Sequence, residues 1–129
     1  MKSRDSVLRL KRFQVQEKAR QLAQIDTMIG EFERMGADLD GQIAYEEKKA
    51  GIDDPDHFAY PTFAKAARLR RENLTNSVRD LQDQQAAAAA ALREVEEELE
   101  KAERKEERDG RTPEYDRGTS DYDRAAMIG

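Results

Sequence analysis

The sequence predicts an all-α protein: a long antiparallel two-helix coiled-coil hairpin followed by a disordered C-terminal tail. Three observations predict this fold. Apolar residues recur at heptad spacing in two segments of nearly equal length, and one short stretch rich in Gly, Pro and Asp separates the segments. The chain is also only 37% hydrophobic and 40% charged. That is too few apolar residues for an ordinary globular core, but a coiled-coil seam needs only two or three in seven.

The first predicted helix covers about residues 2–49, where the sequence contains no Pro. Two apolar series with seven-residue spacing, offset by three residues, give this segment its a and d positions. The first series is Leu8, Val15, Leu22, Ile29, Gly36 and Ile43, and the second is Ile25, Phe32 and Leu39. Gly30, Gly36 and Gly41 each cost about 1 kcal/mol relative to Ala inside a helix. We therefore expect the half of this helix near the loop to be looser, either through simple tolerance or as a hinge.

The loop is predicted at about residues 50–60 and the second helix at about 61–109. Gly51, Pro55 and the aspartates around them are typical of a turn, and Pro61 suits the first turn of a helix. The second helix again shows two heptad series. They are Ala67, Leu74, Leu81, Ala88, Val95 and Ala102, with Val78, Gln85, Leu92 and Leu99. Helices of about 48 residues, roughly 70 Å long at 1.5 Å per residue, joined by a short connection should pack as an antiparallel pair.

Charge patterning favours the same pairing. Residues 1–20 contain seven Lys or Arg and two Asp or Glu, a net charge of +5. Residues 93–109 contain five Lys or Arg and nine Asp or Glu, a net charge of −4. An antiparallel hairpin places these oppositely charged segments side by side. Each exposed pair contributes only a few tenths of a kcal/mol, but together they favour this register.

The sequence predicts no catalytic, cofactor-binding or metal site, and we expect no cofactor and no enzyme activity. There is no Cys, and His57 is the only histidine, without the neighbours that a catalytic or metal-ligating His requires. The first residues lead into no apolar run and no stretch nears 20 apolar residues, so neither a signal peptide nor direct membrane insertion is expected. Residues 110–129 lack apolar periodicity and are predicted to be disordered.

Aromatic residues gather around the predicted loop, at Tyr45, Phe58, Tyr60 and Phe63. The tip of a two-helix hairpin cannot bury four rings. We expect some of them to pack as a small cluster over the turn, and the exposed remainder to mark a protein-binding site. The basic segment of residues 1–20 could also meet a partner, but pairing with the acidic end of the second helix is the simpler reading. It lacks interleaved aromatics and the net charge is −5, so no nucleic-acid partner is expected.

Two local stretches resemble a known family. Residues 3–15, SRDSVLRLKRFQV, are similar to the start of the alphaproteobacterial flagellar export protein FliJ. The stretch from AGIDDP at residues 50–55 to FAKAA at residues 63–67 also resembles this family, and the similarity extends over about residues 1–105. The resemblance implies an antiparallel coiled coil similar to the stalk of rotary ATPases. It also implies a non-enzymatic component of the flagellar type III export apparatus, located in the cytoplasm and peripherally associated with the inner membrane.

The resemblance also implies partners. These are the hexameric ring of the flagellar export ATPase, the cytoplasmic domain of the membrane export gate and export chaperones. By region, the open end of the hairpin would contact the ring, with Arg9, Arg12, Phe13, Leu99 and Glu103 as candidate residues. The half near the loop would contact the gate, with Tyr45, Phe58, Tyr60 and Phe63 as candidates. The alternative is a generic coiled-coil chaperone or tether that binds clients through the aromatics at its tip.

Overall fold

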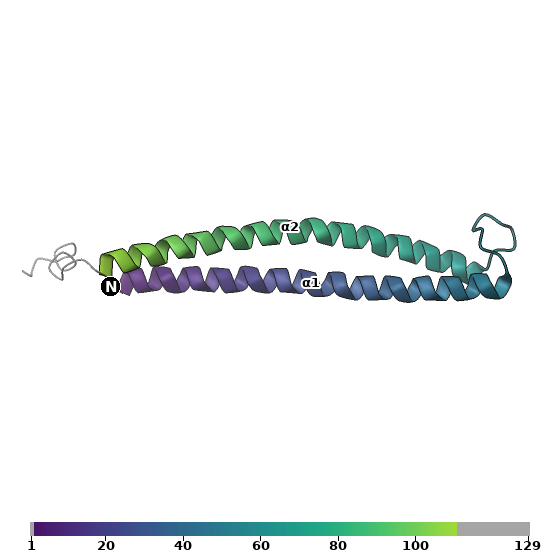
Figure 1. Ribbon diagram of the computed structural model, residues 1–129, viewed down its shortest axis with the longest axis horizontal. Helices are drawn as coiled ribbons and strands as arrows, with labels where there is room; N and C mark the ends of the chain where they lie inside the picture. Colours follow the sequence, from purple (N-terminus) through teal and green to yellow (C-terminus); the bar gives the residue numbers. More distant parts are fainter. Residues whose placement is uncertain (1, 111–129) are drawn as a thin grey trace, which may run out of the picture. The chain divides into compact units, whose positions relative to one another are not determined.

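The structure is a computed structural model that describes residues 2–110, with side chains from residue 3 onward. It contains two α-helices of 49 residues each, α1 at Lys2–Ala50 and α2 at Thr62–Gly110 (Figure 1). The two helices pack against each other, and residues 2–110 include no strand, so the predicted fold class is confirmed. The tail predicted at residues 110–129 lies outside the described residues, except for Gly110, which is the last residue of α2.

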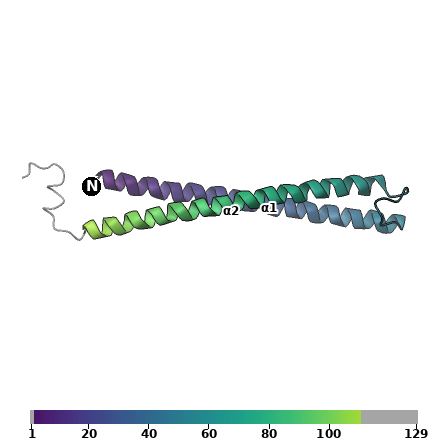
Figure 2. The ribbon, with the colours of Figure 1, turned by 90° about the horizontal axis from the view of Figure 1, so that it is seen from above.

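The chain divides into two compact units. The open-end unit comprises Met1–Glu17 and Leu92–Gly129, and so pairs the start of α1 with the end of α2. The loop unit is Lys18–Ala91, which holds the rest of both helices and their connection. Within each unit the segments of α1 and α2 lie side by side and run in opposite directions (Figures 1 and 2).

The seam between the helices consists of the a and d residues that the heptad series predicts. All of those residues are buried or half-buried. Two helices leave both sides of a seam open, so few side chains are fully covered. Those that are buried and apolar are Leu8, Ile29, Ile43, Tyr60, Ala64, Ala67 and Leu81. Burial of such side chains away from water is the main term that stabilises the pair, at about 0.8 kcal/mol per buried CH₂ group.

Polar contacts across the loop unit fix the register. Gln85 Nε2 donates to Asp26 Oδ1 at 2.6 Å, and Arg71 Nε donates to Asp40 Oδ1 at 2.9 Å. The two contacts are 14 residues apart on α1, from Asp26 to Asp40, and 14 residues apart in the opposite direction on α2, from Gln85 to Arg71. The heptad register holds over this distance without a skip, because each helix advances two whole heptads between the contacts.

α1 ends because Gly51 adopts a backbone conformation that other residues avoid. Its φ is +72°, in the left-handed region where a side chain would clash. This conformation lets the N–H groups of Gly51 and Ile52 both donate to the carbonyl of Glu47, at 2.8 and 3.2 Å. The bond from Ile52 is typical of a glycine-terminated helix, and it satisfies a carbonyl that the last turn would leave unpaired.

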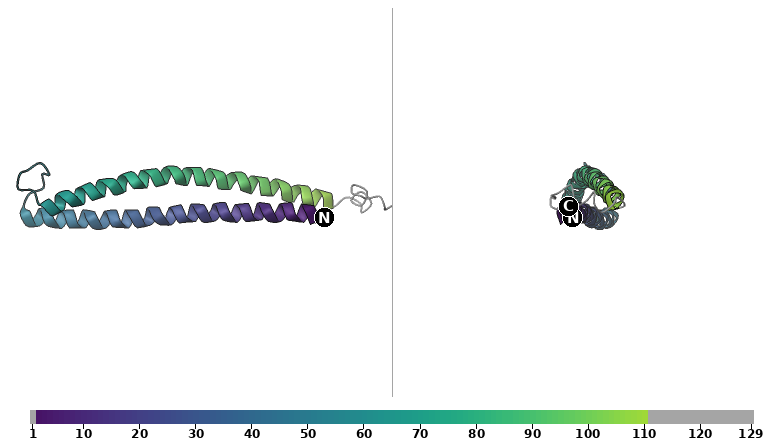
Figure 3. Two further views of the ribbon diagram at one scale, coloured as in Figure 1. Left: turned by 180° about the vertical axis from the view of Figure 1, so that it is seen from behind. Right: turned by 90° about the vertical axis from the view of Figure 1, so that its left-hand side faces the viewer.

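The connection from Gly51 to Pro61 is a folded loop at the end of the loop unit (Figure 3). Two successive turns build it: His57 N donates to the Asp54 carbonyl and Tyr60 N to the His57 carbonyl, each at 3.0 Å. Pro61 precedes α2, and its carbonyl accepts the first helical hydrogen bond, from Lys65 N at 3.0 Å. Because Pro has a fixed φ and no N–H to satisfy, it directs the chain into α2 at low cost.

Candidate protein-binding surfaces

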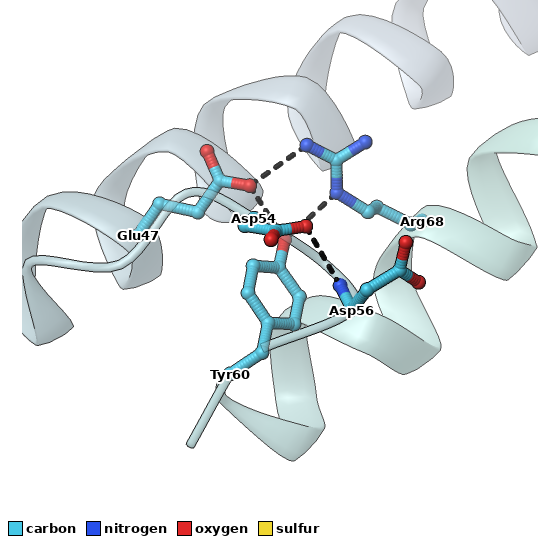
Figure 4. A network of polar contacts seen from close by, with 5 residues as sticks. All are labelled: Glu47, Asp54, Asp56, Tyr60 and Arg68. Carbon is cyan, nitrogen blue, oxygen red and sulfur yellow. Dashed lines mark hydrogen bonds and ion pairs between the residues drawn. The ribbon is translucent and has the colours of Figure 1, made fainter. Parts of the chain in front are cut away.

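A polar network ties the loop to both helices (Figure 4). Tyr60, from the loop, donates through its hydroxyl to Glu47 Oε2 at 2.5 Å, and that hydroxyl accepts from Arg68 Nε at 2.7 Å. Arg68 NH2 also contacts Glu47 Oε2 at 2.8 Å. One residue each from α1, the loop and α2 thus meet at a single hydroxyl. Such charge-assisted bonds are among the stronger ones in proteins.

The same network determines the protonation states of its members. Hydrogen bonds from Tyr60 and Arg68 hold the pKa of Glu47 below its ordinary value of 4.5. Burial, followed by the hydrogen bond to Glu47, raises the pKa of Tyr60 above 10.0. The hydrogen bonds to Glu47 and then to Tyr60 raise the pKa of Arg68 above its ordinary value, so its guanidinium stays protonated. Near pH 7 the network therefore consists of a carboxylate, a neutral phenol and a guanidinium, which is the combination that these three bonds require.

Tyr60 consequently does not belong to the exposed partner surface that the sequence suggested for it. Its side chain is only 7% exposed and its hydroxyl is fully engaged with the two helices. The guanidinium carbon of Arg68 also lies 5.9 Å from the centre of its ring. The expected aromatic cap over the turn is therefore a single ring, held by polar bonds.

While Tyr60 is held against the helices, Phe58 on the same loop is exposed to solvent. Phe58 is 96% exposed, and its only ring contact among residues 2–110 is a stack on His57, with centroids 4.8 Å apart and planes at 21°. His57 is itself held by the loop, since its Nδ1 accepts from the backbone N–H of Ala59 at 3.0 Å. An almost fully exposed phenylalanine on a hydrogen-bonded loop is typical of a contact residue for another protein.

Tyr45 and Phe63 form a second exposed aromatic pair in the loop unit. Tyr45 lies in the last turns of α1 and is 64% exposed, and Phe63 lies in the first turn of α2 and is 48% exposed. Both line one shallow hollow together with Asp38, Gly41 and Glu46. The structure thus brings Tyr45 and Phe63 together at one hollow that Phe58 does not line, and it buries Tyr60.

The open-end unit holds the other five candidate residues. Arg9 and Arg12 are exposed, and Phe13 is 56% exposed. Arg12 NH2 pairs with Glu103 Oε2 at 3.6 Å, with both side chains about half exposed, so these two candidates bind each other across the helices. Leu99 is half-buried in the seam, as its heptad position predicts, and offers less surface to a partner than Phe13 does.

Ion pairs between the basic and acidic ends confirm the charge pairing predicted from the sequence. Arg4 contacts Glu106 at 3.3 Å and Asp109 at 3.2 Å, and Lys11 contacts Glu98 at 3.5 Å. All of these pairs are partly exposed, so each stabilises the open-end unit by well under 1 kcal/mol at moderate salt. Arg4, Lys11 and Arg12 of α1 therefore direct their charges at carboxylates of α2.

Sequence reasoning missed several exposed apolar side chains on the helices. They are Val7, Leu10, Met28, Met35 and Leu69. Met28 and Met35 occupy the g position of the heptad, which coiled coils usually fill with charged residues. That departure was a signal in the sequence, because an uncharged apolar residue beside the seam widens the apolar face beyond what two helices can cover.

No protein-family model, curated protein or solved structure matches this chain. Neither helix in the described range has a stretch apolar enough to cross a membrane. Within residues 2–110 there is also no cluster of three or more His, Asp or Glu side chains placed to hold a metal ion. The features available for a functional argument are therefore the paired helices, the exposed aromatics and the charges around them.

Proposed function

We propose that this chain is a non-enzymatic coupling factor of the flagellar type III protein export apparatus. In this role it acts in the cytoplasm, peripherally associated with the inner membrane, and binds proteins rather than small molecules. The proposal rests on the likeness of residues 3–15 and 50–67 to the FliJ family. The observation that supports it best is the antiparallel pairing of the two long helices, which is the architecture that the family resemblance implies.

The open-end unit is the proposed contact for the export ATPase ring. Arg9 and Phe13 are its most accessible candidates, because both are exposed and neither lies in the seam. Arg12 and Glu103 already pair with each other, so they would exchange that contact for one to the ring. Leu99 supports the surface from within the seam.

The loop unit is the proposed contact for the cytoplasmic domain of the export gate, and export chaperones are proposed as further partners. Phe58, Tyr45 and Phe63 present exposed rings there, and aromatic side chains often supply much of the binding energy of an interface. Tyr60 contributes indirectly, since its bonds to Glu47 and Arg68 hold the loop that presents Phe58.

Two measurements test this proposal. Deletion of the gene in the native bacterium should abolish flagellar filament assembly and motility. The purified protein should stimulate the cognate export ATPase. A variant with Arg9→Glu and Phe13→Ala should lose the stimulation while keeping its helicity by circular dichroism. Normal flagellar filaments in the deletion strain would contradict the proposal.

A generic coiled-coil chaperone or tether is the second candidate, and the 96% exposure of Phe58 favours it. Such a protein would suppress aggregation of unfolded clients without any ATPase. Phe58→Ser should abolish that activity, whereas in the export role it should affect gate binding and leave ATPase stimulation unchanged. The two roles are therefore separable with a single variant.

A further inference from the structure

The two flanks of the seam in the loop unit differ in chemistry. On one flank Asp26, Asp40 and Glu47, all at the e position of α1, bond to residues of α2 at 2.6, 2.9 and 2.8 Å. We call this the bridged flank. The opposite flank carries Met28 and Met35 at the g position, 42% and 49% exposed, and we call it the open flank. The paired helices thus have one side bridged by polar bonds and one apolar side without such bridges.

An apolar groove runs along the open flank. Its apolar lining comes from Phe32, Met35 and Leu39 of α1 and Leu74 of α2, and its volume is about 440 Å³. The polar residues that also line it are Asp38, Gln42, Arg70, Asn73 and Ser77. A groove of this kind between paired helices fits the apolar ridge of another helix, with residues at i, i+3 or i+4, and i+7.

The groove continues into the hollow between the exposed aromatics, because Asp38 and Gln42 line both. The hollow has a volume of about 490 Å³, and Tyr45, Phe63 and Glu46 form its remaining sides. Two aromatic rings with two carboxylates beside them are suited to a cation: the ring faces attract it and the carboxylates pair with it. A lysine or arginine side chain meets both requirements.

Gly41, which lines the hollow, has no packing reason to be glycine. A Cβ atom placed there would meet nothing within 4 Å, whereas glycine inside a helix costs about 1 kcal/mol relative to Ala. Gly36 is different, because a Cβ there would lie 2.8 Å from the guanidinium of Arg71, which bonds to Asp40. The space that Gly41 leaves is the hollow itself, and it is available to a side chain from a partner.

We propose that the open flank binds a single amphipathic helix from a partner protein, with an apolar ridge in the groove and one lysine or arginine in the hollow. The groove residues Met35 and Leu39 precede Tyr45 by 10 and 6 residues, about two to three helical turns. The cation should therefore lie about two turns beyond the end of the apolar ridge that contacts Leu39. The carboxylates of the hollow favour this cationic helix over a second copy, which in a symmetric pairing would place a second acidic hollow on the same surface.

This inference rests on the proposed function, since Tyr45 and Phe63 belong to the suggested gate contact, and it specifies the chemistry of the segment that binds there. The probe is a labelled synthetic helical peptide of about 20 residues, with a leucine ridge and one arginine about two turns beyond its end. A second peptide carries glutamate instead of that arginine. With the full chain, fluorescence anisotropy should give about tenfold tighter binding for the arginine peptide. Equal affinities would overturn the inference.

Substitutions at Gly41 separate binding from folding. Gly41→Ala and Gly41→Leu should both raise the melting temperature, because each removes a glycine from a helix without a clash. Only Gly41→Leu should fill the hollow, and it should weaken binding of the arginine peptide by about tenfold. Ala44→Leu on the bridged flank, where Ala44 lies beside Asp40 and Glu47, is the matched control and should leave binding unchanged.

Three results would count against the inference: undiminished binding to Gly41→Leu, weakened binding to Ala44→Leu, or a dimer in sedimentation that Met35→Glu converts to monomer. The last result would assign the groove to a second copy. The assays also keep the two proposals distinct. If the peptides do not bind but the protein stimulates the ATPase normally, only this inference is contradicted. If the arginine peptide binds selectively but deletion of the gene leaves filaments intact, the export role is contradicted.

Discussion

Replacing Leu81 with Ala should destabilise the chain by about 2–3 kcal/mol. Leu81 lies in the seam of the loop unit and is 6% exposed. Substitution of a buried leucine by alanine costs about 2–5 kcal/mol, depending on how far the neighbours can close the cavity. Both sides of a two-helix seam are open, so the helices can move together and the cost should fall at the lower end. This remains a large fraction of the 5–15 kcal/mol that stabilises a typical domain.

The assay is urea unfolding followed by circular dichroism, with Leu69→Ala as the matched control. Leu69 lies in the same helix but is 61% exposed, so its substitution should change stability by less than about 0.5 kcal/mol. The difference between the two variants isolates burial, because the change in helix propensity is the same. Equal unfolding midpoints would refute the seam assignment. Leu81→Asp, like Leu22→Asp, should remove most helicity, since it places an unpaired carboxylate in the seam.

Three further outcomes follow from the loop network and the open-end unit. Tyr60→Phe removes the hydroxyl that joins the loop to both helices, and should speed amide hydrogen exchange in residues 52–60 without lowering total helicity. The pKa of Glu47 is held below 4.5, so ionised Glu47 stabilises the fold above pH 4.5. This stabilisation should be lost as the pH falls through the depressed pKa, and the Glu47→Gln variant should show no such loss in its stability. Spin labels on cysteines replacing Leu10 and Glu100 should lie within about 20 Å of each other in one molecule, since packed helix axes are about 10 Å apart; a separation of many tens of ångströms would contradict the antiparallel pairing.

The sequence by itself determined the two helices, their ends and their pairing. Heptad spacing marks the seam because residues seven apart return to the same face of a helix. Gly51 and Pro61 mark the ends of the loop because their backbone preferences stop one helix and start the next. Opposite charges at the two chain segments of the open-end unit then predicted the direction of packing, and Arg4 and Lys11 do pair with residues of α2.

Only the tertiary structure decided which side chains of the loop unit are exposed. Tyr60 and Phe58 are two residues apart and look equivalent in the sequence, yet one is 7% and the other 96% exposed. The difference arises because Glu47 and Arg68, which are 21 residues apart, come together only after the chain folds back and so offer partners to a hydroxyl but not to a phenyl ring. The open flank was hidden for the same reason, since a groove needs walls from both helices, and local periodicity describes only one helix at a time.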